Sequence, residues 1–360
     1  MYSEILRIIE GGLNNDKRKI ISYSNRLANH FEKDGDINMA KCILSAIQQL
    51  SIKGSTMDEL RSVPIDNESH LKIVEVIPEN QNRTQIVLSN LVKKQIEDFI
   101  ELINHQDQLE LFGIEIQKTL LLYGQPGCGK TSIAHYISEK TKLPLVIAKL
   151  DAVVSSLLGN TAKNISRIFD YAEASPCILF LDEFDAIAKA RDDEHELGEL
   201  KRVINSLLQN IDSFSPSSIL IAATNHSNLL DKAVWRRFQT TIEVGVPDEY
   251  LWKELLGIII GDFDCDFKNE EKRMEQVIKL LSGKTPSDIK TIFNKVKAQS
   301  VVKGINRITL LNLLLEIYNF NNSNANVDDL VKFLYKNGIT QNLIAENLGI
   351  SLRQVKNDIK

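Results

Sequence analysis

The sequence predicts an α/β fold in which a parallel β-sheet is flanked by helices. Five short segments are almost wholly apolar, as strands buried on both faces of a parallel sheet are, and longer segments of helical character separate them. The first of the five runs directly into the pattern Gly-x-x-x-x-Gly-Lys-Thr, a turn that cradles phosphates between a strand and a helix. The strand candidates are Thr119–Tyr123, Leu145–Leu150, Cys177–Leu181, Ser218–Thr224 and Thr241–Val246.

Composition indicates an ordinary globular protein. The chain has 360 residues, 43% of them hydrophobic and 25% charged, and this length favours two or three domains. The net charge of −5 supplies no general attraction to nucleic acid or to an anionic membrane. No apolar run approaches the length that spans a bilayer, and the N-terminus lacks the basic start and apolar middle of a secretory signal. Cys42, Cys128, Cys177 and Cys265 are scattered, which argues against a disulfide framework or a zinc site, and we expect a cytoplasmic protein.

Residues 1–52 predict an N-terminal helical bundle, because apolar residues recur there at a spacing of three to four and the breaks fall at Gly11-Gly12 and at Asp34-Gly35-Asp36. The sequence leaves open whether this bundle docks a partner or only packs. Residues 53–84 are polar and predict a linker with one β-like run, Leu71–Ile77.

A smaller helical domain is predicted over residues 247–320, after the last strand ends at Pro247 and Asp248. Its helices are Tyr250–Ile260, Glu270–Leu281, Pro286–Val302 and Thr309–Phe320. Residues 321–326 form a second polar linker. Residues 327–360 then predict a helix followed by two helices that are joined by a tight turn containing Gly349, as in a helix-turn-helix.

The segment Thr340–Val355 resembles helix-turn-helix units of transcription regulators. The resemblance places polar side chains toward a DNA groove or phosphates, namely Gln341, Ser351, Arg353, Gln354, Lys356 and Asn357. The basic excess of this segment is small for the electrostatic part of DNA affinity, and helix-turn-helix units also dock proteins. Both partners, DNA and protein, remain open for residues 327–360.

The glycine-rich turn predicts a nucleotide site for ATP or GTP. Its glycines let backbone N–H groups point at phosphates, Lys130 reaches the outer phosphates, and the Thr131 hydroxyl ligates magnesium. The helix that follows adds its N-terminal dipole. The nucleotide-binding residues predicted here are Gly124, Gln125, Pro126, Gly127, Cys128, Gly129, Lys130, Thr131 and Ser132.

Polar side chains follow two of the other strands. Asp182 and Glu183 end the third strand, where Asp182 can hold magnesium through water and Glu183 can polarise the attacking water. A helix cap is the alternative, and it is weak downstream of a phosphate loop. Asn225 follows the fourth strand, where it can orient water or sense a γ-phosphate. Arg236 and Arg237 lie near a helix end, and guanidinium groups suit the charge of a transferring phosphoryl group.

Taken together, these patterns resemble the ATPase module of the AAA family of AAA+ proteins, from about Gln85 to Ser300. The order and spacing of the motifs agree throughout. The stretches that carry the resemblance are Gly113–Thr131, Ile178–Ile187, Leu200–Asp212, Ala223–Asn225, Leu230–Phe238 and Gly283–Ile289.

The resemblance implies hydrolysis of ATP with Mg2+ in a ring of identical subunits, usually a hexamer, with one site at each subunit boundary. Lys130, Thr131, Asp182, Glu183 and Asn225 would serve one site, and Arg236 and Arg237 would reach into the neighbour's. The domain 85–246 would be the large nucleotide-binding domain and 247–320 its lid, with Asp288 near the nucleotide. Two departures stand out: Thr-Pro-Ser-Asp replaces the usual Gly-Ala-Asp, and the two arginines are adjacent, so the identity of the finger stays open.

Two functions follow from the resemblance. The first is an ATP-driven machine that remodels or unfolds a macromolecular client, a protein by preference. Relatives that thread polypeptides carry a pore aromatic where this chain has Leu157, which offers less contact area. The alternative is a DNA-associated regulator controlled by ATP. The module also resembles bacterial stand-alone ATPases that accompany an effector such as a protease, including in defence against phage.

Overall fold

The computed structural model describes residues 2–13, 17–33, 35–36, 38–44, 73–78, 85–150, 158–186, 197–215, 218–268, 270–322 and 326–359. The chain divides into two compact units. The first comprises residues 1–86, 90–124 and 130–244, and the second comprises residues 87–89, 125–129 and 245–360. The division passes through the phosphate loop, because Gln125–Gly129 cluster with the second unit.

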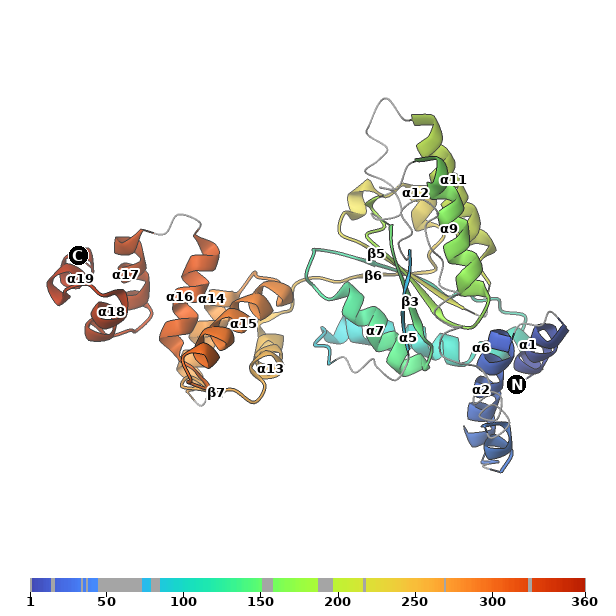
Figure 1. The fold of residues 1–360 in the computed structure, drawn as a ribbon, viewed down its shortest axis with the longest axis horizontal. Coiled ribbons are helices and arrows are strands. Elements are labelled where there is room, and N and C mark those ends of the chain that lie inside the picture. The colour runs from blue at the N-terminus through green and yellow to red at the C-terminus, as the bar shows by residue number, and fades with distance from the viewer. Residues whose placement is uncertain are drawn as a thin grey trace. The chain divides into compact units, whose positions relative to one another are not determined.

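The first unit contains the predicted sheet, and its α/β architecture is confirmed (Figure 1). The strand order is β1-β3-β4-β5-β2-β6, with β1 antiparallel to β3 and the other pairings parallel. Tyr123 of β2 is paired with Thr224 of β5, so the ends of these two strands lie side by side. The strands are β1 Glu75–Ile77, β2 Thr119–Tyr123, β3 Leu145–Lys149, β4 Ile178–Asp182, β5 Ile219–Thr224 and β6 Thr240–Glu243.

Helices cover both faces of this sheet, which explains why its strands are apolar on both sides (Figure 1). Helices α9 (Leu158–Glu173) and α11 (Leu197–Ser213) cover one face and share a core with Leu121 of β2. Helices α5 (Asn90–Asn104) and α7 (Lys130–Thr141) lie on the other face. Shorter elements complete the unit: α6 Gln106–Leu111, η3 Ser227–Leu229 and α12 Lys232–Trp235.

The N-terminal residues are helical as predicted where the structure describes them. Helices α1 (Tyr2–Leu13) and α2 (Lys17–Lys33) pack against each other, and residues 38–44 are also helical. Within the predicted linker 53–84, β1 hydrogen-bonds to β3 and so belongs to the sheet. The linker therefore contributes an edge strand to the nucleotide-binding unit.

The second unit is helical, with one small two-stranded sheet. All four helices predicted between residues 247 and 320 are present. Its elements are α13 Glu249–Ile260, β7 Asp264–Cys265, α14 Glu271–Leu281, α15 Pro286–Val302, β8 Arg307–Ile308, α16 Leu310–Asn321, α17 Val327–Lys336, α18 Gln341–Leu348 and α19 Leu352–Ile359.

The C-terminal helices α17 to α19 share one hydrophobic core with α13 to α16. Val331 and Leu334 of α17 are fully buried in the same cluster as Ile317 of α16. The rings of Tyr318 and Phe333 lie 5.4 Å apart, across the break between α16 and α17. The side-chain amide of Gln276 donates to Asn337 Oδ1 at 2.8 Å, which ties α14 to the end of α17. The helical domain predicted over 247–320 and the helical segment predicted over 327–360 therefore share one core.

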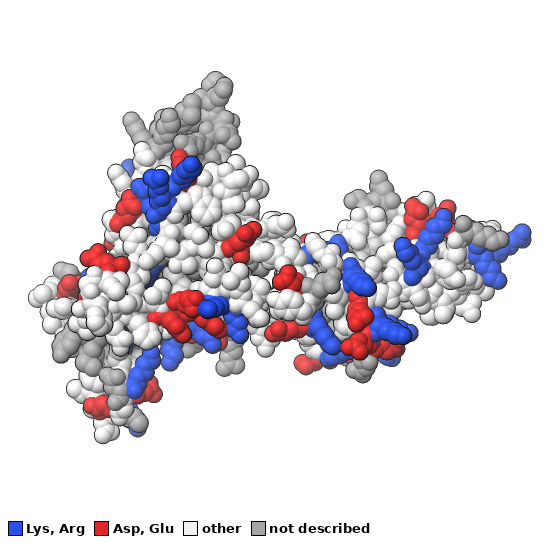
Figure 2. All heavy atoms as spheres, turned by 180° about the vertical axis from the view of Figure 1, so that it is seen from behind, with Lys and Arg blue, Asp and Glu red and all other residues white. Residues whose placement is uncertain are grey.

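Helix α18 ends at Gly349, which adopts a left-handed conformation with φ 67° and begins the turn to α19, while the helix-turn-helix assignment of the pair stays a prediction. Their assignment to the DNA-binding class stays a prediction. The described residues of this segment carry as many acidic as basic side chains: Asp328, Asp329, Glu346 and Asp358 against Lys332, Lys336, Arg353 and Lys356. Acidic and basic side chains are also interleaved over the face in Figure 2.

The four cysteines are free thiols, so no disulfide cross-links the fold. Among the described helices, none is long and apolar enough to cross a membrane.

Candidate nucleotide site

Two glycines of the phosphate loop occupy positions that a side chain cannot. Gly124 has φ 141°, and a Cβ atom built there would lie 2.2 Å from the carbonyl oxygen of Val244. Gly127 has φ 77°, and its Cβ would lie 2.7 Å from Thr285 Oγ1. The backbone N–H of Ser287 donates to the Gly127 carbonyl at 3.2 Å. Close backbone approach therefore explains both glycines.

Lys130 and Thr131 begin α7, the helix that follows the loop. The Lys130 ammonium is buried and donates to the Gly124 carbonyl at 2.8 Å. The Thr131 hydroxyl donates to Asp182 Oδ2 at 3.3 Å. A hydroxyl and a carboxylate that lie together in this way fit Mg2+, which takes oxygen ligands and usually only one or two carboxylates beside substrate phosphates. The structure thus brings together the two predicted metal ligands, which are far apart in sequence.

The turn after β4 holds Glu183 in an unusual backbone conformation. Glu183 has φ 53°, in the left-handed region that non-glycine residues rarely adopt. The Glu183 N–H donates to Asp182 Oδ1 at 2.9 Å, and the Phe184 N–H donates to the Ala223 carbonyl at 2.9 Å. These bonds fix the turn against the end of β5. Backbone strain held by surrounding bonds is typical of functional turns.

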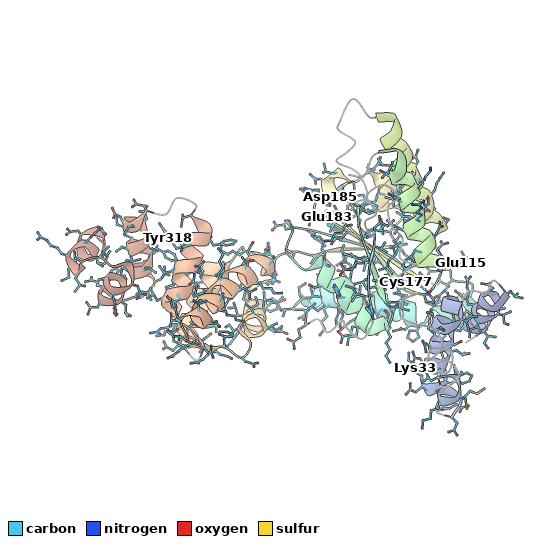
Figure 3. All side chains as sticks on the ribbon, in the orientation of Figure 1. Lys33, Glu115, Cys177, Glu183, Asp185 and Tyr318 are labelled. Carbon is cyan, nitrogen blue, oxygen red and sulfur yellow. The ribbon has the colours of Figure 1, made fainter. Side chains whose placement is uncertain are left out.

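Asp185 is a buried acid that is not among the predicted site residues. Its side chain is 2% exposed, and Oδ1 accepts hydrogen bonds from the Thr224 hydroxyl at 3.0 Å and from the Asn225 N–H at 3.2 Å. It therefore ties the Glu183 turn to the predicted sensor residue Asn225. Figure 3 shows Glu183 and Asp185 close together past β4, whereas Cys177 lies at the start of that strand. The sequence signal that could have identified Asp185 was its position two residues after Glu183, as a third acid at the end of the same strand.

The two adjacent arginines have different surroundings. Arg236 is exposed. Arg237 is partly buried, with its Nε 2.9 Å from Asp212 Oδ1, and its guanidinium also donates to Asp212 Oδ2 at 3.0 Å. The sequence placed both arginines in one role, but among the described residues only Arg237 has an intramolecular ion pair.

Asp288 caps α15. The side chain of Thr285 accepts from the Asp288 N–H at 3.2 Å, and the Asp288 carboxylate accepts from the Thr285 N–H at 3.1 Å and from its hydroxyl at 2.8 Å. This reciprocal capping box accounts for the Thr-Pro-Ser-Asp sequence, with Pro286 at the first helical position. Contact of Asp288 with the nucleotide stays a prediction.

Comparison with known proteins identifies the family of the domain that carries this site. Residues 120–246 match the model of the ATPase family associated with various cellular activities (AAA). This stretch is an AAA ATPase domain. ATP and Mg2+ are the cofactors of that family. The matched residues include the phosphate loop, Asp182, Glu183, Asn225 and the two arginines.

Relatives extend the similarity beyond this AAA domain. The AAA family ATPase y4kL of Sinorhizobium fredii is 43% identical over 51% of the chain and 53% of its own length. The proteasome-activating nucleotidase of Methanocaldococcus jannaschii is 31% identical over 63% of the chain and 57% of its own length. FtsH 2 of Symbiobacterium thermophilum, an ATP-dependent zinc metalloprotease, is 30% identical over 61% of the chain and 38% of its own length. The chain thus spans about half the length of the curated relatives it matches.

The predicted pore residue Leu157 lies outside the described residues; α9 begins one position later, at Leu158. The stretch Leu200–Asp212 lies within helix α11.

Proposed function

We propose that this protein hydrolyses MgATP as a homo-oligomeric AAA ring and uses the cycle to remodel or unfold a protein client. The observation that carries the proposal is the meeting of Thr131 with Asp182 beside the loop lysine, while Glu183 is held on a strained turn next to them. This arrangement supplies the cation, the metal ligands and the general base that phosphoryl transfer to water requires.

Each residue has a distinct task in this proposal. When bound, Mg2+ would neutralise the charge that develops on the phosphate oxygens. Thr131 and Asp182 would hold the metal, and Lys130 would bind the outer phosphates. Glu183 accepts a proton from the attacking water, whose position Asn225 helps to fix. Asp185 keeps the Asn225 backbone in place through its 3.2 Å hydrogen bond.

The exposed position of Arg236 supports the proposed ring. It is exposed, and within the described part of the chain its guanidinium makes no ion pair. An arginine finger supplied from another subunit stabilises phosphoryl transfer strongly. A head-to-tail interface repeated around a closed ring would give every site one such arginine. A hexamer is the ring size that the family resemblance favours.

Subunit mixing tests the shared site. Arg236→Ala subunits keep their own phosphate loop, and Lys130→Ala subunits keep their Arg236, so each is inactive alone. In an equal mixture, the rate of hydrolysis should recover to about a quarter of the wild-type rate. Random assembly places a subunit with an intact loop next to a subunit with an intact Arg236 at about a quarter of the sites. Mixing Lys130→Ala with Glu183→Gln is the matched control and should restore nothing, since both changes affect the same subunit's half of a site. No recovery at any ratio of the first pair would contradict the shared site.

The client is inferred from relatives. The names of two of them, a proteasome-activating nucleotidase and an ATP-dependent metalloprotease, concern the handling of proteins. A protein client, with a protease or another effector as a partner, is therefore the first candidate. The balanced charge of residues 327–359 gives no separate support to a DNA partner.

A trapping experiment identifies the client. Glu183→Gln protein is retrieved from the native cell with ATP and Mg2+, with and without nuclease, and Lys130→Ala serves as the control. Proteins that resist nuclease and are missing from the control would support remodelling of a protein. Recovery of DNA, or of proteins only through DNA, would replace this proposal with the DNA-associated regulator.

A further inference from the structure

The segment Trp235–Phe238 holds both arginines, and three of its four side chains are anchored inside their own subunit. Trp235 lies edge-on to Tyr123, with ring centroids 5.1 Å apart, and Phe238 lies edge-on to Phe184 at 5.9 Å. Tyr123 directly precedes Gly124 of the phosphate loop, and Phe184 directly follows Glu183. The two aromatic pairs therefore pack the segment against the residue before the phosphate loop and the residue after Glu183, both in the subunit's own nucleotide site.

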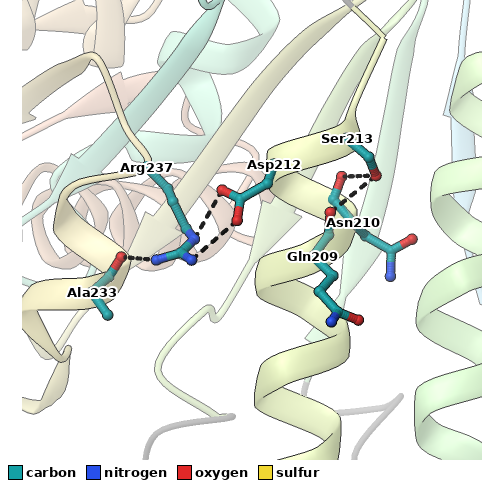
Figure 4. A network of polar contacts seen from close by, with 6 residues as sticks. All are labelled: Gln209, Asn210, Asp212, Ser213, Ala233 and Arg237. Carbon is teal, nitrogen blue, oxygen red and sulfur yellow. Dashed lines mark hydrogen bonds and ion pairs between the residues drawn. The ribbon is translucent and has the colours of Figure 1, made fainter.

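Arg237 provides the third anchor, and Figure 4 shows it between two helices. Its guanidinium forms a two-point ion pair with Asp212 of α11, and its Nη1 donates to the Ala233 carbonyl in α12 at 2.6 Å. The fork of an arginine matches a carboxylate in this geometry, which fixes orientation as well as distance. One side chain thus ties α12 to the end of α11.

The last turn of α11 has a side-chain hydrogen bond of its own. Ser213, next to Asp212, donates its hydroxyl to the Gln209 carbonyl at 2.9 Å (Figure 4). Asp212 is half exposed, so the free energy of this ion pair in water is small and the pair contributes little to overall stability. Its effect is geometric, because it determines where the residue next to Arg237 points.

Resting on the proposed shared site, we infer that Arg237 and Asp212 are positioning residues, and that Arg236 alone meets the nucleotide of the neighbouring subunit. Two guanidinium nitrogens of Arg237 donate hydrogen bonds within the chain and the third lies 2.9 Å from Asp212 Oδ1, whereas Arg236 is exposed between two anchored neighbours. Arg236 therefore contacts the neighbouring subunit's nucleotide, and Arg237 fixes the segment that carries Arg236.

Steady-state ATP hydrolysis by the full chain tests this division. Arg236→Ala should lower kcat by about 10³-fold or more, as loss of a finger does. Arg237→Ala and Asp212→Asn should each lower kcat by about 10-fold to 100-fold, since displacing a reacting group by about 1 Å costs that much. The KM for ATP should change little in all three, because each subunit's own loop is intact. Arg307→Ala, which breaks a different exposed ion pair with Asp264, is the matched control and should leave kcat unchanged.

The double variant Asp212→Asn/Arg237→Ala gives the decisive comparison. If the two residues act as one pair, the double variant loses no more kcat than the worse single variant. Arg237→Lys should recover only part of the loss, because lysine keeps the charge but not the fork. A loss in Arg237→Ala as large as that in Arg236→Ala, with Asp212→Asn near wild type, would overturn the inference by making Arg237 a finger. Full activity of Arg236→Ala would instead contradict the proposal that each nucleotide site is shared between two subunits.

Discussion

Glu183→Gln should abolish nearly all ATP hydrolysis while leaving ATP binding intact. The change removes the carboxylate that accepts a proton from water, and general-base catalysis contributes about 10²-fold to 10⁴-fold. Glutamine has nearly the same shape, so the turn with φ 53° and its hydrogen bonds to Asp182 and Ala223 should persist. Phosphate release measures hydrolysis, and equilibrium titration with labelled ATP measures binding.

Two controls make this result specific. Glu139→Gln changes an exposed acid on α7 and should leave hydrolysis unchanged. Lys130→Ala should lose binding as well as hydrolysis, since its ammonium is held at the loop. Hydrolysis by Glu183→Gln within about threefold of wild type would assign the proton transfer to another group.

Leu334→Ala should destabilise the entire helical unit rather than its C-terminal helices alone. Leu334 is fully buried in the core shared by α13 to α19, and truncating a buried leucine costs about 2–5 kcal/mol of unfolding free energy. Calorimetry of the full chain should show the transition that belongs to the second unit moving to lower temperature.

The matched control is Leu343→Ala on α18, where the side chain is 44% exposed and the cost should be within about 0.5 kcal/mol. If α17 to α19 were a tethered module, Leu334→Ala would leave the transition of α13 to α16 in place. Deletion of residues 322–360 should have a larger effect than Leu334→Ala, because it uncovers Ile317 and Tyr318. Such a deletion would therefore report on the packing of α13 to α16 as much as on any partner of the C-terminal helices.

The sequence predicted the sheet well because its signals are local. The strand Thr119–Tyr123 and the helix Pro286–Val302 have the predicted bounds, since an apolar run entering a glycine turn and a proline after a capping threonine each mark an element end. The pairing of β1 with β3 depends on contacts between distant segments, which a polar stretch around a short β-like run does not reveal.

The candidate site shows the same contrast. Lys130, Thr131, Asp182 and Glu183 fall in motifs whose residue types follow from phosphate and metal chemistry. The buried Asp185 and the partner of Arg237, Asp212, are ordinary acids in sequence, and only the fold brings them to Asn225 and to the arginine segment. The shared core of α16 and α17 was hidden by the polar residues 321–326, which separate the two helices in sequence but not in space.

The placement of the two tryptophans gives this protein intrinsic fluorescent reporters. Trp235 is partly exposed and lies edge-on to Tyr123, one residue before the phosphate loop, whereas Trp252 is 1% exposed in the core of the helical unit. Indole emission shifts to shorter wavelength in apolar surroundings, so Trp252 should emit on the blue side and Trp235 on the red side. Nucleotide binding at the loop should change the longer-wavelength emission of Trp235 more than the emission of Trp252. Occupancy of the site can therefore be followed without a label.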